Sequence, residues 1–502
     1  MLNAPKKIVS GMAYLLVCTY LGRSYGFLAS TVLLPRLIDA GTMGGVALGA
    51  STFLLLMSMK DLGFSFALMH HQERIDELAP THFLLNVLVS AVWIGVAVSV
   101  LLLSHYFPPH SGWLRGLTAS LEGGGGSLAL WAVVCFCAAD LFRSASYTAE
   151  TRLKARLAFR AVAVVHMLAL VLSLTVALVL AHRGLGGWAL IIGGAASYVT
   201  YSPVYVLFTV FCIWRLQPWE LRRVRLNRSH ARELWHYGRW VWVGDIFYTL
   251  LNEVPKIVAG ALLGWAQLGY YFVAYTWAQM SVGAITHILV SLTNPVYARY
   301  QKDRERLSLA FNKMLRLVAR AVCLLNLIFL LESERLVGLA GAHYGASVPL
   351  LRLLVPFALL RPFLDDAHSL FLAVGDPKAV ARINLVQAVL SVVLVALLSY
   401  AGGIRGIAVA AGLTAAVGLL IAVGRLRRHV DVAWGRALIA PLASASVALG
   451  VGLWADAYLP SRGALAVAGR VALDTALYTG MLVLLERQEL LDEWRFLRQS
   501  AR

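Results

Sequence analysis

Residues 161–181 read AVAVVHMLALVLSLTVALVLA, twenty-one consecutive positions without an Asp, Glu, Lys or Arg. An α-helix of about 20 apolar residues spans the ~30 Å hydrocarbon core of a bilayer. Runs of this kind recur along the whole chain of 502 residues, which is 59% hydrophobic and only 14% charged. The sequence therefore predicts an all-α polytopic membrane protein.

The apolar runs predict about fourteen transmembrane helices. The first run is too long for a secretory signal and has no small-residue cleavage site, so we expect it to be a helix of the mature protein. The expected spans are 8–34, 43–69, 82–104, 128–150, 161–181, 186–214, 240–263, 266–294, 315–331, 346–372, 383–400, 404–424, 437–457 and 464–485.

The basic residues are distributed unevenly between the loops. The chain has 44 Lys and Arg and a net charge of +18, and roughly thirty of these bases fall in alternate gaps between the spans. This asymmetry predicts that both termini lie on the cytoplasmic side of the membrane. Because the excess charge lies in short loops, we expect it to meet anionic lipid headgroups, and we expect no nucleic-acid partner.

Two parts of the chain share a weak pattern, G-x-x-G-x-A-apolar-x-x-G, at Gly184–Gly193 and at Gly403–Gly412. The pattern lies at the start of the sixth and the twelfth span. It favours two six-helix lobes related by a parallel repeat, with a substrate path between them. The expected organisation is an N-terminal lobe at 1–214, a basic cytoplasmic linker at 215–239, a C-terminal lobe at 240–424, and a C-terminal helix pair with a cytoplasmic tail at 425–502.

Eight bases lie inside the apolar spans, where an uncompensated charge costs at least ~2.5 kcal/mol. Four of them have an acid one helical turn away, which predicts the pairs Asp140 with Arg143, Glu253 with Lys256, Arg361 with Asp365, and Arg470 with Asp474. Such pairs serve either to neutralise a helix for insertion or to line a transport pathway. The other four bases are Arg23, Lys60, Arg320 and Arg352.

Arg23 lies near the middle of the first span without an acid within a turn, so we expect it to face an aqueous cavity or another helix. Arg320 and Arg352 lie nearer span ends and could reach the interface. A lumen lined by Arg23, Lys60, Lys256 and Arg361, with Arg352 as a further candidate, would suit an anionic diphosphate.

Other intramembrane residues are candidates for gating or coupling. Pro255 removes a backbone hydrogen bond from the seventh span and predicts a bend that serves either gating or packing. Asp365, Asp366 and His368 form an acidic cluster that invites a metal or proton-relay interpretation, but the ligands are too few to specify a metal. Asp140, Glu253 and Asp474 complete this set. The chain has no phosphate-binding loop, metalloprotease motif or nucleophile elbow, so we predict no catalytic residues.

Four stretches of sequence resemble a known family. They are Leu33–Gly44 (LLPRLIDAGTMG), Asp61–Ala67 (DLGFSFA), Asn252–Gly264 (NEVPKIVAGALLG) and Gly375–Asn384 (GDPKAVARIN). Together they resemble the polysaccharide-transport oligosaccharide flippases (Wzx-like) of the multidrug/oligosaccharidyl-lipid/polysaccharide exporter superfamily. In the seventh span such proteins often carry an acid directly before the basic residue, whereas this chain has Pro255 before Lys256.

The resemblance implies a function. The implied cargo is a polyprenyl-diphosphate-linked oligosaccharide that is moved from the inner to the outer leaflet for O-antigen, capsule or exopolysaccharide synthesis. Arg23 and Arg36 fall where related flippases carry bases. The resemblance also implies alternating access, membrane lipids as neighbours, and a polymerase and glycosyltransferases as partners. No cofactor is expected, and an ion or the membrane potential is left open as the driving force.

Two other classes of protein fit the composition. A drug or cation exporter of the same superfamily would carry acids in its lumen, whereas the first span here offers Arg23. A membrane polymerase or ligase would need a substantial outer loop or a loop cluster of His, Glu and Arg, and the sequence shows neither.

Overall fold

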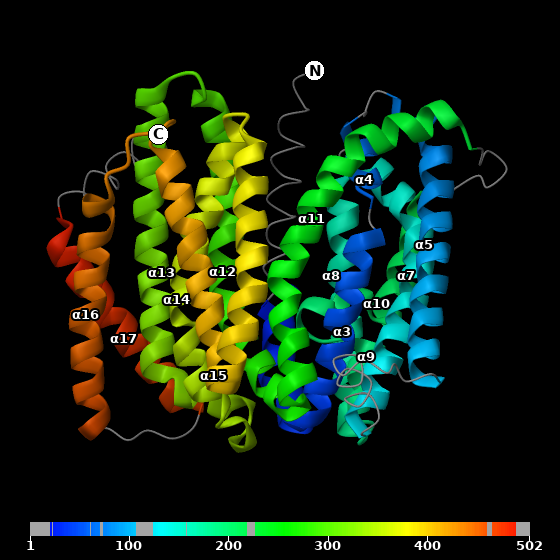
Figure 1. Ribbon diagram of the computed structural model, residues 1–502. Coiled ribbons are helices and arrows are strands. Elements are labelled where there is room, and N and C mark those ends of the chain that lie inside the picture. Colours follow the sequence, from blue (N-terminus) through cyan, green and yellow to red (C-terminus); the bar gives the residue numbers. More distant parts are fainter. Residues whose placement is uncertain are drawn as a thin grey trace. The chain divides into compact units, whose positions relative to one another are not determined.

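The computed structural model (Figure 1) describes residues 21–22, 24–60, 62–70, 74–106, 124–156, 158–217, 226–458 and 464–487. Every regular element within these ranges is helical, and ten of the helices are long and apolar enough to cross a membrane. The all-α polytopic fold is therefore confirmed, while the count of fourteen stays a prediction. The chain divides into two compact units, Met1–Phe272 and Val273–Arg502. The lobe and linker bounds expected from the sequence also stay predictions.

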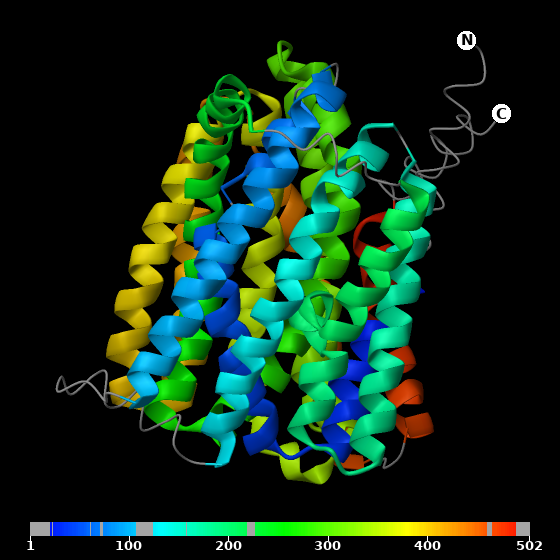
Figure 2. The ribbon, with the colours of Figure 1, turned by 90° about the vertical axis from the view of Figure 1, so that its right-hand side faces the viewer.

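The first unit is built from long helices joined by short connections. In both views (Figures 1 and 2), α5 and α7 run side by side along much of their length. The helices of this unit are η1 (Ala29–Leu33), α2 (Leu34–Leu37), α3 (Ala40–Lys60), α4 (Phe64–His70), α5 (Ile75–Tyr106), α7 (Gly124–Ala155), α8 (Phe159–His182), α9 (Gly187–Gly193), η3 (Ala196–Tyr201), α10 (Pro203–Leu216), α11 (Arg228–Leu263) and the start of α12 (Trp265–Tyr300).

The sixth predicted span, 186–214, is not one helix. It consists of α9, the short 3₁₀ helix η3, and α10. Gly194 has φ +79°, a conformation that favours glycine, and Ser202 is extended just before Pro203 opens α10. The expectation of a continuous span was wrong because hydropathy measures apolar length and does not detect these backbone breaks.

Glycines allow α3 and α12 to cross at backbone contact. A Cβ on Gly44 would lie 1.8 Å from the carbonyl oxygen of Trp265, and a Cβ on Gly269 would lie 1.9 Å from the carbonyl oxygen of Ala40. The contact is reciprocal, since each helix offers a carbonyl four residues before its glycine. Small residues at four-residue spacing are the usual means of such close packing between membrane helices.

Helix α11 is held against the end of α3. The indole Nε1 of Trp242 donates hydrogen bonds of 3.0 Å to the carbonyl oxygens of Ser58 and Met59, which lie in the last turn of α3. Nearby, Gly63 has φ +70°, and a Cβ there would lie 2.5 Å from the carbonyl oxygen of Gly238. These contacts fix which face of α11 is turned toward α3.

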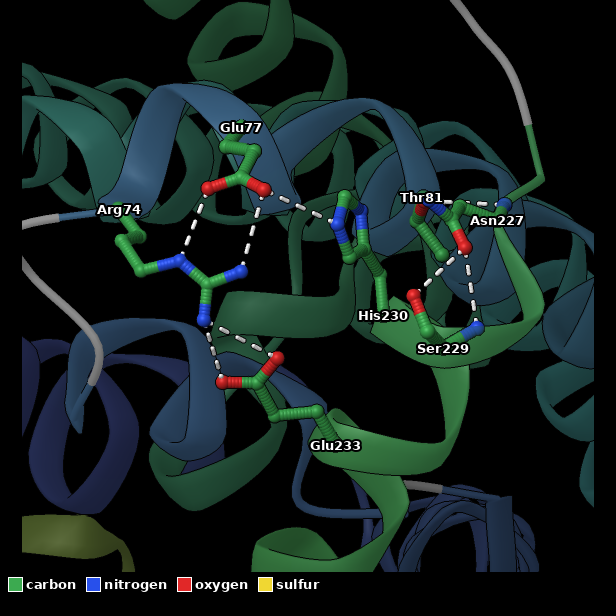
Figure 3. A network of polar contacts seen from close by, with 7 residues as sticks. All are labelled: Arg74, Glu77, Thr81, Asn227, Ser229, His230 and Glu233. Atoms are coloured by element: carbon green, nitrogen blue, oxygen red, sulfur yellow. Dashed lines mark hydrogen bonds and ion pairs between the residues drawn. The ribbon is translucent and has the colours of Figure 1, made fainter.

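A polar network joins the beginning of α11 to the beginning of α5 (Figure 3). Arg74 donates to Glu77 at 2.8 Å and to Glu233 at 3.0 Å, and His230 lies 3.2 Å from the same Glu77. The hydrogen bonds to Glu77 and the nearby charge of Glu233 raise the pKa of Arg74 above its ordinary value. The basic segment 215–239 thus contributes the first turns of α11, which begins at Arg228 behind the capping side chain of Asn227.

The second unit contains the remainder of α12 and the last helices of the chain. They are α13 (Arg304–Ala340), η5 (Ala342–Tyr344), α14 (Ser347–Ala373), α15 (Pro377–Leu426), α16 (Trp434–Tyr458) and α17 (Ala464–Leu485). Helix α15 reverses direction at Gly403, where φ is +57° and ψ is −137°. Gln387 donates a 3.0 Å hydrogen bond to the carbonyl of Thr414, although a straight helix would hold these residues ~40 Å apart. The segment is a helical hairpin, in agreement with the two spans predicted at 383–400 and 404–424.

Ion pairs attach the C-terminal helix pair to α13. Arg320 of α13 lies 2.7 Å from Glu486 just beyond α17, and Tyr478 donates a 2.8 Å hydrogen bond to the carbonyl of Arg320. Nearer the C-terminal end of α13, Glu332 lies 3.7 Å from Arg470 of α17. No acid lies one helical turn from Arg320 in the sequence, and its partner Glu486 comes from a distant segment.

Candidate functional site

A cavity of about 230 Å³ lies within the first unit, between α3, α7, η3 and α11. Helix α11 contributes a row of polar residues, Asp245, Tyr248, Asn252 and Glu253. The spacing of three and four residues places Asp245, Tyr248 and Asn252 on one helical face, and Glu253 borders that face. Tyr248 is 45% exposed, whereas Glu253 is buried, so the row runs from the surface inward.

Lys60 and Asp140 form a buried ion pair in the wall of this cavity. Lys60 is the last residue of α3, and Asp140 lies in the middle of α7. Their side chains are only 7% and 1% exposed. The predicted pair of Asp140 with Arg143 is therefore wrong. Lys60 reaches Asp140 from another helix, and a search for acids within one turn cannot find such a partner.

Arg143 has a different environment. Its guanidinium lies 5.1 Å from the ring centre of Tyr201, 5.5 Å from that of Tyr147 and 5.9 Å from that of Tyr205. It also donates to the carbonyl of Thr200 in η3. The broken sixth span supplies this carbonyl and Tyr201, and cation–π contact with the rings compensates the buried charge. Sequence reasoning missed the arrangement, although Gly193-Gly194 and Ser202-Pro203 were signals of a break.

The predicted pair of Glu253 with Lys256 is confirmed. The ammonium of Lys256 lies 2.9 Å from both carboxylate oxygens of Glu253, and both side chains are buried. Glu253 also lines the cavity. Pro255 is buried inside α11, which continues to Leu263, and a gating role for it stays a prediction.

The acidic cluster of α14 lies in the second unit. Arg361 lies 3.1 Å from Asp365 as predicted, and Thr286 donates a 2.9 Å hydrogen bond to the other oxygen of Asp365. Tyr297 donates a 2.9 Å hydrogen bond to Asp366. The second oxygen of Asp366 and Nε2 of His368 are buried and have no hydrogen-bond partner among the described residues. Within that part of the chain no group of three or more His, Cys, Asp or Glu could hold a metal ion.

The remaining candidates are spread over both units. Arg36 is exposed in the last turn of α2. Arg352 donates to Ser333 at 2.8 Å and to Glu334 at 3.1 Å, and Asp474 is fully buried in α17. Arg23 lies outside the described residues.

The expected cationic lumen stays a prediction, because Arg23 lies outside the described residues and Arg352 and Arg361 belong to the other unit. The structure brings Lys60, Asp140 and Glu253 together around one cavity, with Lys256 bound to Glu253. Among the described residues, the cavity wall holds three carboxylates, including that of Asp245, and one ammonium, and the guanidinium of Arg143 lies within 6 Å of two of the lining rings. Lys60, Lys256, Arg361 and Arg352 each have a carboxylate partner. The sequence predicted the bases inside the spans but did not predict which acids would meet them around this cavity.

Membrane transporters commonly show an arrangement of this kind. Long membrane helices surround a polar cavity at a broken helix, and charged residues within the spans border it. Known proteins with similar sequences act in polysaccharide biosynthesis. Residues 128–349 match the family described as "Polysaccharide biosynthesis protein". The chain is 24% identical over 372 residues to the lipopolysaccharide biosynthesis protein WzxC of Escherichia coli (strain K12). The matched region covers 73% of this chain and 70% of WzxC.

Solved structures share the fold. The inward closed conformation of the lipid II flippase MurJ matches 95% of this chain and 99% of its own, with a TM-score of 0.71 at 11% identity. An inward-facing multidrug resistance transporter of the MATE family matches 82% of this chain and 98% of its own, with a TM-score of 0.62 at 15% identity. The chain is thus similar in sequence to a polysaccharide biosynthesis family and to WzxC, and similar in fold to MurJ and to a MATE transporter.

Proposed function

We propose that this protein moves a polyprenyl-diphosphate-linked oligosaccharide from the inner to the outer leaflet of the bacterial cytoplasmic membrane by alternating access. The product would serve the synthesis of O-antigen, capsule or exopolysaccharide. The relation to a lipopolysaccharide biosynthesis protein and the fold shared with a lipid II flippase support this cargo. Both termini would lie in the cytoplasm, and a polymerase and glycosyltransferases that act on the same lipid would be its partners.

One observation carries the proposal. Two buried ion pairs, Lys60–Asp140 and Glu253–Lys256, border a polar cavity at the point where the sixth span is broken. In membrane transporters, irregular backbone at membrane depth is tolerated where it lines a cavity, and it marks the substrate site. Charges are costly there, so two pairs beside one cavity are better explained by transport than by structural support alone.

The bases divide into two groups with different proposed roles. Lys60 and Lys256 are each held by a carboxylate, and we assign them to coupling, with Asp140 and Glu253 as their partners. We assign the cargo diphosphate to Arg23 and Arg36, where the family resemblance implies bases. An ion or the membrane potential would drive the cycle. Asp366, whose second oxygen has no hydrogen-bond partner among the described residues, is a further candidate ion carrier.

The test is deletion of the gene in its host, followed by measurement of the lipid-linked oligosaccharide with an impermeant glycosidase. We expect the oligosaccharide to accumulate on the inner leaflet, protected from the enzyme, and the wild-type gene to clear it. Accumulation on the outer leaflet would indicate a polymerase or ligase. Absence of accumulation would contradict the proposed cargo.

A cation exporter is the second candidate, because a specific observation favours it. The fold is shared with a multidrug resistance transporter of the MATE family, and the cavity is lined by carboxylates, which attract cations. The deletion strain would then retain ethidium longer than the wild type, while its lipid-linked oligosaccharide would be unchanged. The same pair of strains therefore separates the two candidates.

A further inference from the structure

We propose that the first turns of α11 are clamped to the ends of α3, α4 and α5 and stay clamped throughout the transport cycle. These turns, residues 228–242, are called the arm, and they end where the apolar part of α11 begins. The arm positions the face of α11 that lines the cavity, and it makes α11 move with the first unit. The inference rests on the alternating access of the proposed function.

A buried leucine anchors the middle of the arm. Leu234 is 0% exposed and packs in an apolar cluster that includes Phe64 of α4 and Leu78 of α5. Its neighbours on the arm, Arg232 and Trp235, are exposed. Releasing the arm would return the leucine side chain to water, and the hydrophobic effect opposes that step.

A contact between two backbones fixes the rotation of the arm. A Cβ on Gly238 would lie 2.4 Å from the carbonyl oxygen of Leu62, and a Cβ on Gly63 would lie 2.5 Å from the carbonyl oxygen of Gly238. Turning α11 by one residue would bring a side chain to a place that only glycine fits. The arm therefore has one rotational setting at this contact.

Polar contacts hold both ends of the arm. At its beginning, the backbone N–H of Asn227 donates a 3.3 Å hydrogen bond to the hydroxyl of Thr81, and Arg74 lies 3.0 Å from Glu233 (Figure 3). At its end, the indole of Trp242 donates to two carbonyl oxygens in the last turn of α3. These carbonyls have no partner within their own helix, so the indole supplies one.

The clamped face of α11 continues into the cavity. Leu234, Gly238 and Trp242 recur every four residues, and Asp245 and Asn252 follow at spacings of three and seven. Such spacings form one stripe along a helix. Asp245 and Asn252 line the cavity, and α11 is a single helix from Arg228 to Leu263. The rotation that is set at the arm thus decides which side chains of α11 face the cavity.

The clamp also decides which moving body α11 belongs to. The first compact unit extends to Phe272 and includes the whole of α11, whereas the sequence placed 240–263 in the second lobe. With the clamp closed, the chain passes from the first moving body to the second within α12. The basic segment 215–239 is then an internal connection of the first body and not its hinge.

A reversible cross-link tests whether the clamp opens during transport. Arg74→Cys/Glu233→Cys, in a variant whose five native cysteines are replaced by alanine, is joined by a short bis-methanethiosulfonate in proteoliposomes. The original pair is 47% and 30% exposed, so its loss should cost little stability. With cross-linking measured by the loss of free thiols, we expect the same rate of oligosaccharide transport before cross-linking, after it and after reduction. Loss of transport that reduction restores would overturn the proposal, because the arm would then have to leave its site.

Thiol labelling tests the clamp without a transport assay. In nanodiscs, Leu234→Cys should react with a maleimide on the order of tenfold more slowly than the matched Arg232→Cys, both with and without a polyprenyl-diphosphate-linked oligosaccharide. Adding Gly238→Ala should raise the labelling of Leu234→Cys toward that of Arg232→Cys, and in the wild-type background it should reduce transport at unchanged helix content. Gly244→Ala, which has open space around it among the described residues, should do neither. Equal labelling of the two cysteines, or a Gly238→Ala variant that changes neither labelling nor transport, would overturn the proposal.

The two tests separate failure of this inference from failure of the proposed function. If the wild type does not move the oligosaccharide, the proposed cargo is wrong, and the labelling of Leu234→Cys still decides whether the arm is clamped. If the wild type moves it and the cross-link stops it, the proposed function stands and the permanent clamp falls.

Discussion

Removing one partner of the Lys60–Asp140 pair should destabilise the protein strongly. The two side chains are 7% and 1% exposed, so Asp140→Asn leaves an ammonium in a place with little access to water. Breaking a buried pair by removing one partner costs about 3–5 kcal/mol. This corresponds to between about two and four powers of ten in the unfolding equilibrium constant.

A double-mutant cycle isolates the pair. Lys60→Met alone should cost a similar amount, because it leaves the carboxylate of Asp140 unpaired. The double variant Lys60→Met/Asp140→Asn removes both charges, and we expect it to recover about 2–3 kcal/mol relative to the sum of the single changes. The control is Glu334→Gln, which breaks the exposed pair with Arg352 (72% and 44% exposed) and should cost less than ~1 kcal/mol.

Equilibrium unfolding in mixed detergent micelles, with SDS as the denaturant and circular dichroism as the signal, gives these free energies. If Asp140→Asn lies within about 0.5 kcal/mol of the wild type, the pair is screened by water. The electrostatic description of the cavity would then be refuted.

Three further predictions concern other contacts. Gly269→Ala should abolish folded protein in detergent extracts, because the added Cβ would lie 1.9 Å from a backbone carbonyl oxygen of α3. The control is Gly244→Ala, which should fold as the wild type does, because the described residues leave open space around Gly244. Arg143→Lys keeps the charge but loses the planar group that stacks among three tyrosines, so it should reduce transport several-fold at equal expression, and full activity would argue against that role. Arg320→Met should leave Glu486 buried without its basic partner and lower the SDS midpoint of unfolding, and Arg320→Met/Glu486→Gln should recover part of the loss; a midpoint equal to the wild type's would contradict the attachment of the C-terminal helix pair.

Much of the fold was predictable because apolar length is a local property of the sequence. A span such as 161–181 needs no tertiary information, since the bilayer sets the required length. The pairs Glu253–Lys256 and Arg361–Asp365 were predictable for the same reason, because helical geometry alone brings residues three or four apart together. The glycine pattern at Gly403 coincides with a true reversal of the chain.

What the sequence did not predict depends on contacts between helices. Asp140 has a base one turn away at Arg143, yet it pairs with Lys60, which is eighty residues distant in the sequence. Arg143 instead donates a hydrogen bond to the carbonyl oxygen of Thr200, in the broken segment of the sixth span. The break lies within a run of apolar residues, so hydropathy did not show it. The cavity that the break helps to form, and the ion pairs that border it, depend on the arrangement of the helices in space.

The most direct test of the central claim is transport by the purified protein in proteoliposomes. A polyprenyl-diphosphate-linked oligosaccharide is placed in both leaflets, and an added glycosidase that cannot cross the membrane digests the outer pool. With the wild type, under an imposed pH gradient or membrane potential, we predict that the protected half of the lipid is digested as well. Continued protection of about half of the lipid under every gradient, with the protein shown to be folded, would contradict the account.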